Sequence, residues 1–113
     1  MNHLIIIGAG GMGRTMYDMA RESIGYGEEY DIKGFIDDNI AALDGFPNYP
    51  PLLSAITTYQ PQANDIFVCS IGGSARRKCM NEIIARGGRF LTMIHKTVRL
   101  GTNVTIGEGT VIG

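Results

Sequence analysis

Residues 5–14, Ile-Ile-Ile-Gly-Ala-Gly-Gly-Met-Gly-Arg, place glycines at positions 8, 10 and 13 in the spacing G-x-G-x-x-G. The first glycine of this pattern permits a tight turn, the second lets a ligand approach the backbone, and the third lets a helix pack closely on a strand. The free N–H groups at the start of the following helix favour a phosphate. We therefore predict phosphate binding at this turn; the alternative for such a spacing is a plain strand-to-helix turn.

A second glycine turn, Gly72-Gly73-Ser74, follows another apolar run, with Ser74 as a candidate N-cap. Cations come soon after both turns: Arg14 after the first, and Arg76, Arg77 and Lys78 after the second. A positive charge in the first turn of a helix opposes the helix dipole by about 0.3–1 kcal/mol, so this placement favours a nearby anion. The alternative is a set of solvated surface cations.

Asp37 and Asp38 end a predicted strand at the distance from Gly13 where a dinucleotide-binding fold places the acid that contacts a ribose. A carboxylate accepts hydrogen bonds from ribose hydroxyls or from the N–H edge of a pyrimidine, and it repels phosphate. We predict that these two acids contact a nucleoside. The alternative is an Asx-type turn that closes the end of the strand.

The sequence gives little support for redox, metal or catalytic chemistry. Cys69 and Cys79 have neither a metal-ligand spacing nor a C-x-x-C redox spacing, and we expect two reduced structural thiols. His3 and His95 are the two histidines, and each is expected to be structural. The sequence shows no Ser/His/Asp order, no paired acid site and no metal cluster, so we predict no catalytic residue and no metal within this chain.

The composition limits the classes of partner that the chain is expected to bind. The 113 residues carry 10 basic and 11 acidic side chains, a formal net charge of −1, which disfavours nucleic acids and membrane surfaces as partners. No apolar run approaches the roughly 18 residues of a membrane span, and the first residues do not resemble a signal peptide. We expect a cytoplasmic protein.

The predicted elements alternate between strand and helix. Apolar runs predict strands over 3–8, 30–36, 65–71 and 89–94, and the isoleucines of the first run indicate burial on both faces. Helical spacing of apolar residues predicts a helix over 12–24 and another after Ser74 that Gly87 ends, with a short helix over 52–59 after a loop over 40–51. The order predicts an α/β fold: a Rossmann-like open parallel sheet of about four strands with ligands bound between the first and third strands.

The pattern changes after His95. Leu100-Gly101, Ile106-Gly107 and Ile112-Gly113 recur every six residues, with Val98, Val104 and Thr110 each two residues earlier. A six-residue period of this kind is typical of a β-helix. Because one coil cannot bury its apolar face without stacked neighbours, we expect the chain to be the N-terminal piece of a longer protein, with one domain over 1–95 and the first coil of a β-helix over 96–113.

Several motifs occur in this order along the chain: G-A-G-G-x-G-R, G-F-I-D-D-N, F-V-x-x-I-G, I-H and the hexapeptide repeats. On these motifs the chain resembles the NeuD/PglD-type sugar acyltransferases over essentially its whole length. These are left-handed β-helix enzymes with an N-terminal nucleotide-sugar domain. The resemblance implies that Asp37 and Asp38 contact uracil and ribose of a UDP-sugar. It implies that the two turns cradle its phosphates, which gives as candidate residues Gly8, Gly10, Gly11, Met12, Gly13, Arg14, Ile71, Gly72, Arg76 and Arg77.

The resemblance also implies that the β-helix binds acetyl-CoA between neighbouring subunits of a trimer, and that the catalytic histidine falls beyond Gly113. Two positions depart from the family pattern. Many members have histidine where this chain has Met12, so either the acceptor differs or that histidine is dispensable. The usual I-H-P junction is Ile94-His95-Lys96 here, without the proline that restrains entry into the coil.

These features together favour the nucleotide-sugar-binding part of an acetyl-CoA-dependent sugar N- or O-acetyltransferase of bacterial glycan biosynthesis, with a UDP-amino-sugar as substrate. The isolated 113 residues are expected to be inactive in acetyl transfer and monomeric or weakly dimeric. One alternative is a nucleotide- or sugar-sensing regulatory module. An NAD-binding oxidoreductase half is disfavoured, because hexapeptide repeats stand where its second mononucleotide-binding half belongs.

Overall fold

The computed structural model describes residues 1–102, 104 and 106–113 of the chain. The main sheet and its helices are formed by β1 (Asn2–Ile7), α1 (Gly11–Arg21), β2 (Tyr30–Ile36), β3 (Leu52–Ser54), β4 (Asp65–Cys69) and α2 (Gly73–Ala85). A short 3-10 helix, η1, spans Ile56–Thr58, and two short strands follow α2, namely β5 (Met93–Ile94) and β6 (Val111–Ile112).

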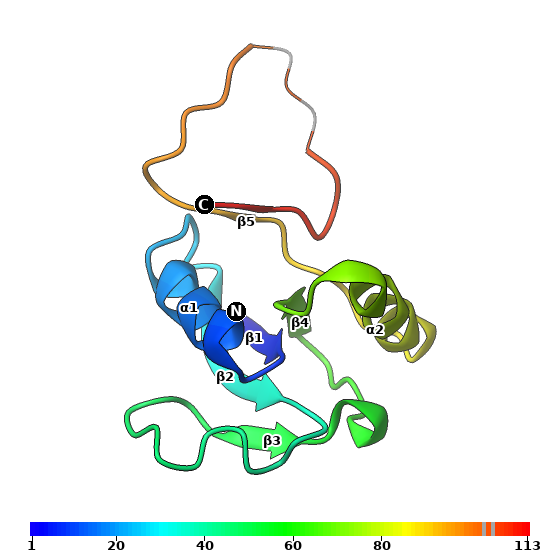
Figure 1. Ribbon diagram of the computed structural model, residues 1–113. Helices are drawn as coiled ribbons and strands as arrows, with labels where there is room; N and C mark the ends of the chain where they lie inside the picture. The colour runs from blue at the N-terminus through cyan, green and yellow to red at the C-terminus, as the bar shows by residue number, and fades with distance from the viewer. Residues whose placement is uncertain (103, 105) are drawn as a thin grey trace.

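The main sheet is parallel, with strand order β3-β2-β1-β4. The chain builds outward from β1 to β3 and then returns to the other side of β1 with β4, so the strand order reverses between β1 and β4. Figure 1 shows α1 on one face of the sheet and α2 on the other. The predicted α/β class and the predicted parallel sheet of about four strands are confirmed.

Alternating residues of β1 supply both cores. Leu4 and Ile6 belong to the cluster that includes Met16 of α1, whereas Ile5 and Ile7 belong to the cluster that includes Ile83 of α2. All four β1 side chains are fully buried. Burial of the isoleucine run on both faces, as expected for a central strand of a parallel sheet, is therefore confirmed.

The fourth strand of the sheet was predicted at the wrong place. Residues 52–59 were expected to be a short helix, but β3 occupies the first three of them and pairs with β2, and only η1 is helical. Pro50 and Pro51 favour an extended approach to β3. At Gly34 a side chain would overlap the Pro51 carbonyl oxygen, so the missing Cβ lets the two backbones approach.

The strand predicted over 89–94 does not join this sheet as a strand. Its backbone bridges β4 once, at Phe90 and Phe67, where the Phe67 N–H donates to the Arg89 carbonyl and the Leu91 N–H to the Phe67 carbonyl. The chain then turns away, and Met93–Ile94 pairs in parallel with Val111–Ile112. The prediction was wrong because the partner of this segment lies in the repeat region and not in β4.

Three finer predictions also fail. The first helix ends at Arg21, and Ile24 is exposed and donates its N–H to the Ile94 carbonyl. The helical spacing predicts both Ile83 and Ile84 on the inner face of the second helix; Ile83 is buried as expected, but Ile84 is 53% exposed. Ser74 is no cap, because the N-cap position is Gly72. Gly87 does end α2, with a φ of 91° and its N–H bonded to the Ile84 carbonyl, as expected.

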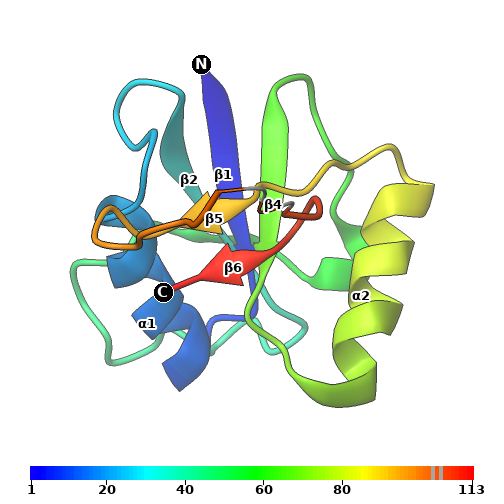
Figure 2. The same ribbon diagram turned by 90° about the horizontal axis from the view of Figure 1, so that it is seen from above.

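The segment that carries the predicted repeats brings β6 back beside β5. Met93 pairs with Val111 and Ile94 with Ile112, an offset of eighteen residues, which is three six-residue repeats. Figures 1 and 2 show β6 lying beside β5, on the side of the sheet where β4 lies. The predicted repeats include Asn103 and Thr105, which lie outside the described residues.

The region after β5 is fastened to the end of α1. The Ile24 N–H donates to the Ile94 carbonyl at 2.8 Å, the Lys96 N–H donates to the Glu22 carbonyl at 3.1 Å, and Ser23 forms an antiparallel bridge with His95. The His95 Nε2 atom also lies 3.8 Å from a carboxylate oxygen of Glu22. Backbone hydrogen bonds therefore hold this junction, without the proline of the family pattern.

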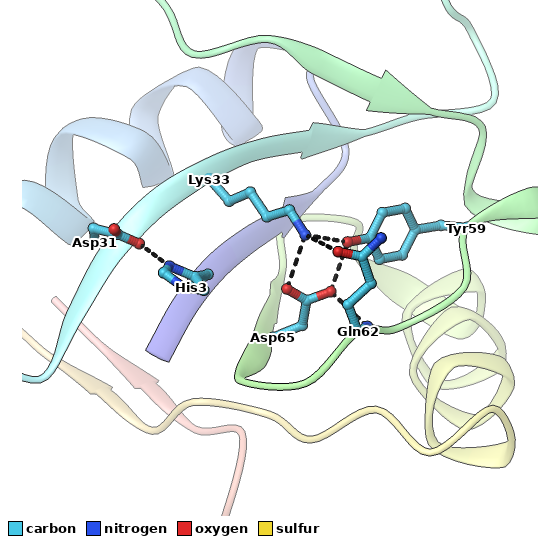
Figure 3. Close-up of polar contacts among 6 residues, drawn as sticks. All are labelled: His3, Asp31, Lys33, Tyr59, Gln62 and Asp65. Atoms are coloured by element: carbon cyan, nitrogen blue, oxygen red, sulfur yellow. Dashed lines mark hydrogen bonds and ion pairs between the residues drawn. The ribbon is translucent and has the colours of Figure 1, made fainter. Parts of the chain in front are cut away.

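A polar cluster surrounds Asp65, the first residue of β4 (Figure 3). The Asp65 carboxylate, almost fully buried, accepts hydrogen bonds from the Tyr59 hydroxyl at 2.6 Å, the Gln62 N–H at 2.8 Å and the Lys33 ammonium at 3.0 Å. Burial raises the pKa of Asp65, but these three donors outweigh it and leave the pKa below its ordinary value. Burial lowers the pKa of Lys33, but its bonds to Tyr59 and Asp65 leave that pKa raised.

An Asp65→Ala variant should lose about 2–3 kcal/mol of the free energy of unfolding, because Lys33 is left without its anion and two further donors lose their acceptor. The matched control is Asp31→Ala: Asp31 is half exposed, pairs with His3 at 2.7 Å in the same view, and should cost less than about 1 kcal/mol. Urea unfolding measures both. Equal losses would show that the Asp65 cluster has no special role in stability.

The same cluster makes the free energy of unfolding depend on pH. Since the folded pKa of Asp65 lies below the ordinary 3.8, its contribution is present at neutral pH and disappears as the pH falls below that value. Since the folded pKa of Lys33 lies above 10.5, its contribution is present below that pH and disappears as the pH rises beyond it. The difference in stability between the parent chain and Asp65→Ala should therefore shrink toward both extremes.

Candidate functional site

The three glycines of the first turn have three different surroundings. Gly8 has a φ of 95°, a conformation that suits glycine. At Gly13 an added Cβ would overlap the Gly8 carbonyl oxygen and lie 2.7 Å from its carbonyl carbon, so the third glycine lets α1 pack against the end of β1. At Gly10 an added Cβ would meet no atom within 4 Å, so the backbone there faces open space. This division matches the turn, packing and ligand-approach roles of the glycine pattern.

Ser70 joins the two turns, and sequence reasoning missed it. Its hydroxyl lies 2.7 Å from the Ile7 carbonyl oxygen, to which it donates, and 3.2 Å from that of Gly8. A Cβ on Gly8 would also lie 3.2 Å from the Ile71 side chain, so the two predicted turns meet where the strand order reverses. The available signal was a polar residue directly after the apolar run of β4.

Asp37 lies against the first turn. Its carboxylate accepts the Ala9 N–H at 2.8 Å through one oxygen and the Asn39 N–H at 2.8 Å through the other. The second bond is the Asx-type turn considered from the sequence, and the first ties the end of β2 to the glycine turn. A carboxylate has about four lone-pair sites, so both roles leave acceptor capacity for a ligand.

Asp38 points to a different partner. One of its carboxylate oxygens accepts the N–H of Ile56 at 2.9 Å and that of Thr57 at 3.3 Å, so this side chain caps the start of η1. The side chain is exposed. The structure therefore brings Asp37 to the glycine turn and places Asp38 beside it in the chain but directed at η1.

Arg14 and Met12 follow the turn on α1. One Arg14 nitrogen, Nη1, donates to the Ala9 carbonyl at 3.2 Å, and the guanidinium carbon lies 3.8 Å from the centre of the Phe46 ring. Met12 is 62% exposed, so it is a surface side chain beside the turn and not part of the inner stripe of α1. Both residues directly follow the glycine turn in the chain. The helical spacing of apolar residues also predicted Met12 on the inner face of this helix, and that prediction was wrong.

Arg76 and Arg77, which follow the second turn, differ in their contacts and exposure. Arg76 donates to the Cys69 carbonyl at 2.6 Å and lies 3.4 Å from the Gly109 carbonyl oxygen, so its guanidinium links the end of β4 to the repeat region. Arg77 is exposed and, with Arg76, Met80 and Glu108, lines an open pocket of about 640 Å³ between α2 and residues 108–111. This pocket thus adjoins the second turn and not Asp37.

The remaining reactive groups are structural in their surroundings. Burial raises the pKa of the Cys69 thiol and also that of Cys79, so neither is an activated nucleophile at neutral pH. The His95 Nδ1 atom lies 2.7 Å from the Thr97 hydroxyl. Within residues 1–102, 104 and 106–113, no group of three or more His, Cys, Asp or Glu side chains is placed to hold a metal ion. No helix in this part of the chain is long and apolar enough to cross a membrane.

A parallel sheet with helices on both faces and a glycine turn at the reversal of strand order is the arrangement of Rossmann-like nucleotide-binding domains. The family model described as "PglD N-terminal domain" matches residues 3–84, and the chain belongs to this family. The resemblance inferred from the sequence motifs is confirmed.

One curated relative is the UDP-N-acetylbacillosamine N-acetyltransferase of Bacillus subtilis (strain 168). It is 29% identical over 117 residues, which cover 99% of this chain and 51% of the relative. The chain therefore spans about half the length of the curated relative that it matches.

Proposed function

We propose that this chain binds a UDP-amino-sugar and is the nucleotide-sugar-binding part of an acetyl-CoA-dependent sugar N- or O-acetyltransferase of bacterial glycan biosynthesis. One observation carries the proposal: in a chain of the PglD N-terminal domain family, open space at Gly10 lies beside Arg14 and the Asp37-bound Ala9, where the strand order reverses. The name of the Bacillus relative, an N-acetyltransferase, supports the same reaction class.

We assign the roles of the candidate residues as follows. Gly10, with Gly11 beside it, leaves room for the diphosphate, whereas Gly8 and Gly13 allow the tight turn and the helix packing that expose this space. Helix N-terminal N–H groups and Arg14 stabilise the charge of the diphosphate. Asp37 and Asp38 accept hydrogen bonds from the nucleoside. Ile71 and Gly72 form the facing wall, and the pocket at Arg77 and Glu108 receives the sugar, since it opens from the second turn.

We further propose that residues 1–95 form the nucleotide-sugar domain and that residues 96–113 form the first coil of a left-handed β-helix, which the eighteen-residue offset of β6 from β5 supports. In the complete cytoplasmic enzyme, a trimer, a histidine base outside these residues removes a proton from the acceptor amine or hydroxyl. The acceptor then attacks the thioester carbonyl of acetyl-CoA, the C–S bond breaks, and coenzyme A leaves as the thiol or thiolate.

Calorimetric titration of the 113-residue chain with UDP-N-acetylglucosamine, UDP and NAD tests the proposal. Binding of the two uridine compounds without binding of NAD is expected. Binding of NAD alone would overturn it in favour of a dinucleotide site. Acetyl-CoA added together with a UDP-amino-sugar should give no free thiol with this chain, and rapid thiol release that depends on the amino-sugar would place the catalytic base within it.

Replacing either acid with asparagine should weaken UDP binding. For Asp37→Asn and Asp38→Asn we expect a loss of about 1–3 kcal/mol, the range for hydrogen bonds to a charged group. Asparagine is preferred to alanine because both carboxylates also accept backbone N–H groups, so alanine would destabilise the fold as well. Calorimetry gives the affinity and thermal unfolding checks the fold. Unchanged affinity in both variants would leave these acids with the structural role alone.

A further inference from the structure

The loop between β2 and β3 is held firmly against α1. Leu43 packs on the core cluster beneath α1, and the Tyr49 ring packs edge-on against Tyr17 of α1, with ring centres 5.5 Å apart, and against Phe35 of β2. Figures 1 and 2 show this loop running beside the first half of α1. The loop is thus anchored on the protein core on both sides of Phe46.

Phe46 lies at the tip of this anchored loop. Its N–H donates to the Leu43 carbonyl at 3.0 Å, and positive φ values at Gly45 and Asn48 fold the backbone on either side. The ring is nevertheless 45% exposed, and the group it faces is the Arg14 guanidinium, at 3.8 Å. A guanidinium stacked at this distance on an aromatic face is attracted by the ring quadrupole. The loop therefore presents an aromatic platform to one particular cation.

The other edge of that guanidinium touches the glycine turn. Arg14 Nη1 donates to the Ala9 carbonyl, and Arg14 Nη2 lies 3.8 Å from the position that a Cβ on Gly11 would occupy. The charged group thus lies across residues 9–11, which border the open space at Gly10. Arginine has five N–H donors in a planar fork, so the bond to Ala9 leaves donors for a phosphate.

We infer that Phe46 is a positioning residue for the diphosphate of the nucleotide: its ring holds the Arg14 guanidinium across the glycine turn, ready to donate to a phosphate oxygen at Gly10. This inference rests on the proposed function. A free arginine side chain loses rotamer freedom when it binds an anion, and a stacked arginine has already lost it. The loop after β2 therefore strengthens the binding of the phosphate end, and not of the nucleoside.

The test compares UDP with uridine by calorimetry in five chains: the parent, Phe46→Leu, Phe46→Tyr, Arg14→Gln and the double variant Phe46→Leu with Arg14→Gln. Phe46→Leu should raise the Kd for UDP by about threefold to tenfold, the range for a cation on an aromatic ring, and leave the Kd for uridine unchanged. Phe46→Tyr keeps the aromatic face and should restore UDP binding. Adding Phe46→Leu to Arg14→Gln should cause no further loss, since the ring acts through Arg14.

Each contrary result has its own meaning. A parent chain that binds neither UDP nor UDP-N-acetylglucosamine overturns the proposed function, and this inference with it. Normal UDP binding by Phe46→Leu overturns the inference and leaves the proposed function intact. Equal weakening of UDP and uridine also overturns it, because it indicates a general disturbance of the loop. Thermal unfolding of each variant checks that the comparison is made between folded chains.

Discussion

Gly13→Ala should lower the free energy of unfolding by at least about 3 kcal/mol, the upper end for a side chain forced into occupied space. The new Cβ would overlap the carbonyl oxygen of Gly8, a backbone atom at the end of β1 that cannot rotate away. Relief would require α1 to move away from the sheet, and with it the contacts of Met16 and Ala20 with the core. Chemical denaturation measures the loss.

Gly11→Ala is the matched control. Gly11 lies two residues earlier on the same helix, and an added Cβ there would meet only the Arg14 side chain, at 3.8 Å. Alanine is also the better helix former, by up to about 1 kcal/mol. We expect a stability equal to or slightly above that of the parent chain. A similar loss at both positions would mean that helix formation, and not the contact with Gly8, limits the choice of residue.

Gly10→Val should weaken UDP binding by at least about 100-fold while the chain remains folded. The backbone at Gly10 is extended, with φ −75° and ψ −166°, and an added Cβ meets no protein atom within 4 Å, so the fold has room for valine. A diphosphate would not have room to bind, because the branched valine side chain would fill the space that the diphosphate must occupy. We expect a cost in folding of only about 1 kcal/mol, from a poorer residue at the N-cap.

Uridine serves as the internal comparison for this variant, because it lacks the phosphates. Its affinity should fall much less than that of UDP when both are titrated by calorimetry into the parent chain and into Gly10→Val. Undiminished binding of UDP would show that Gly10 only joins β1 to α1. Gly13→Ala and Gly10→Val thus separate two functions of one short motif: one variant loses the fold and the other the ligand.

The sequence predicted the parts of the fold that depend on long, local patterns. The isoleucine run of β1, the bounds of β2 and the glycine turn into α1 could be read directly because each spans several residues of one pattern. β3 could not be predicted in this way, because a strand of three residues is too short to show the two-residue alternation of a strand. β5 lies within a predicted strand, but its pairing could not be predicted, because its partner, β6, comes eighteen residues later.

The candidate site was predicted in its residue types and less well in its geometry. Asp37 was predicted from its spacing after Gly13 at the end of a strand, and the structure bonds it to Ala9 of the glycine turn. Asp38 is directed at η1, which comes eighteen residues later, and Arg76 turns back to the Cys69 carbonyl. Neither direction can be read from the residue types alone. Phe46 gave no signal at all, because its position over Arg14 results from the packing of Leu43 and Tyr49.

The two ends of α1 are attached to different parts of the molecule. Its first turn carries Arg14 beside the open space at Gly10, and directly after its last residue Glu22 and Ile24 bond to the backbone on both sides of His95. Eleven helical residues form a stiff rod of about 16 Å, which acts as a lever between these ends. If the helix tilted at the glycine turn, the backbone around His95 would shift with it, and amide exchange at Ile24 and Lys96 would then respond to a ligand bound one helix length away.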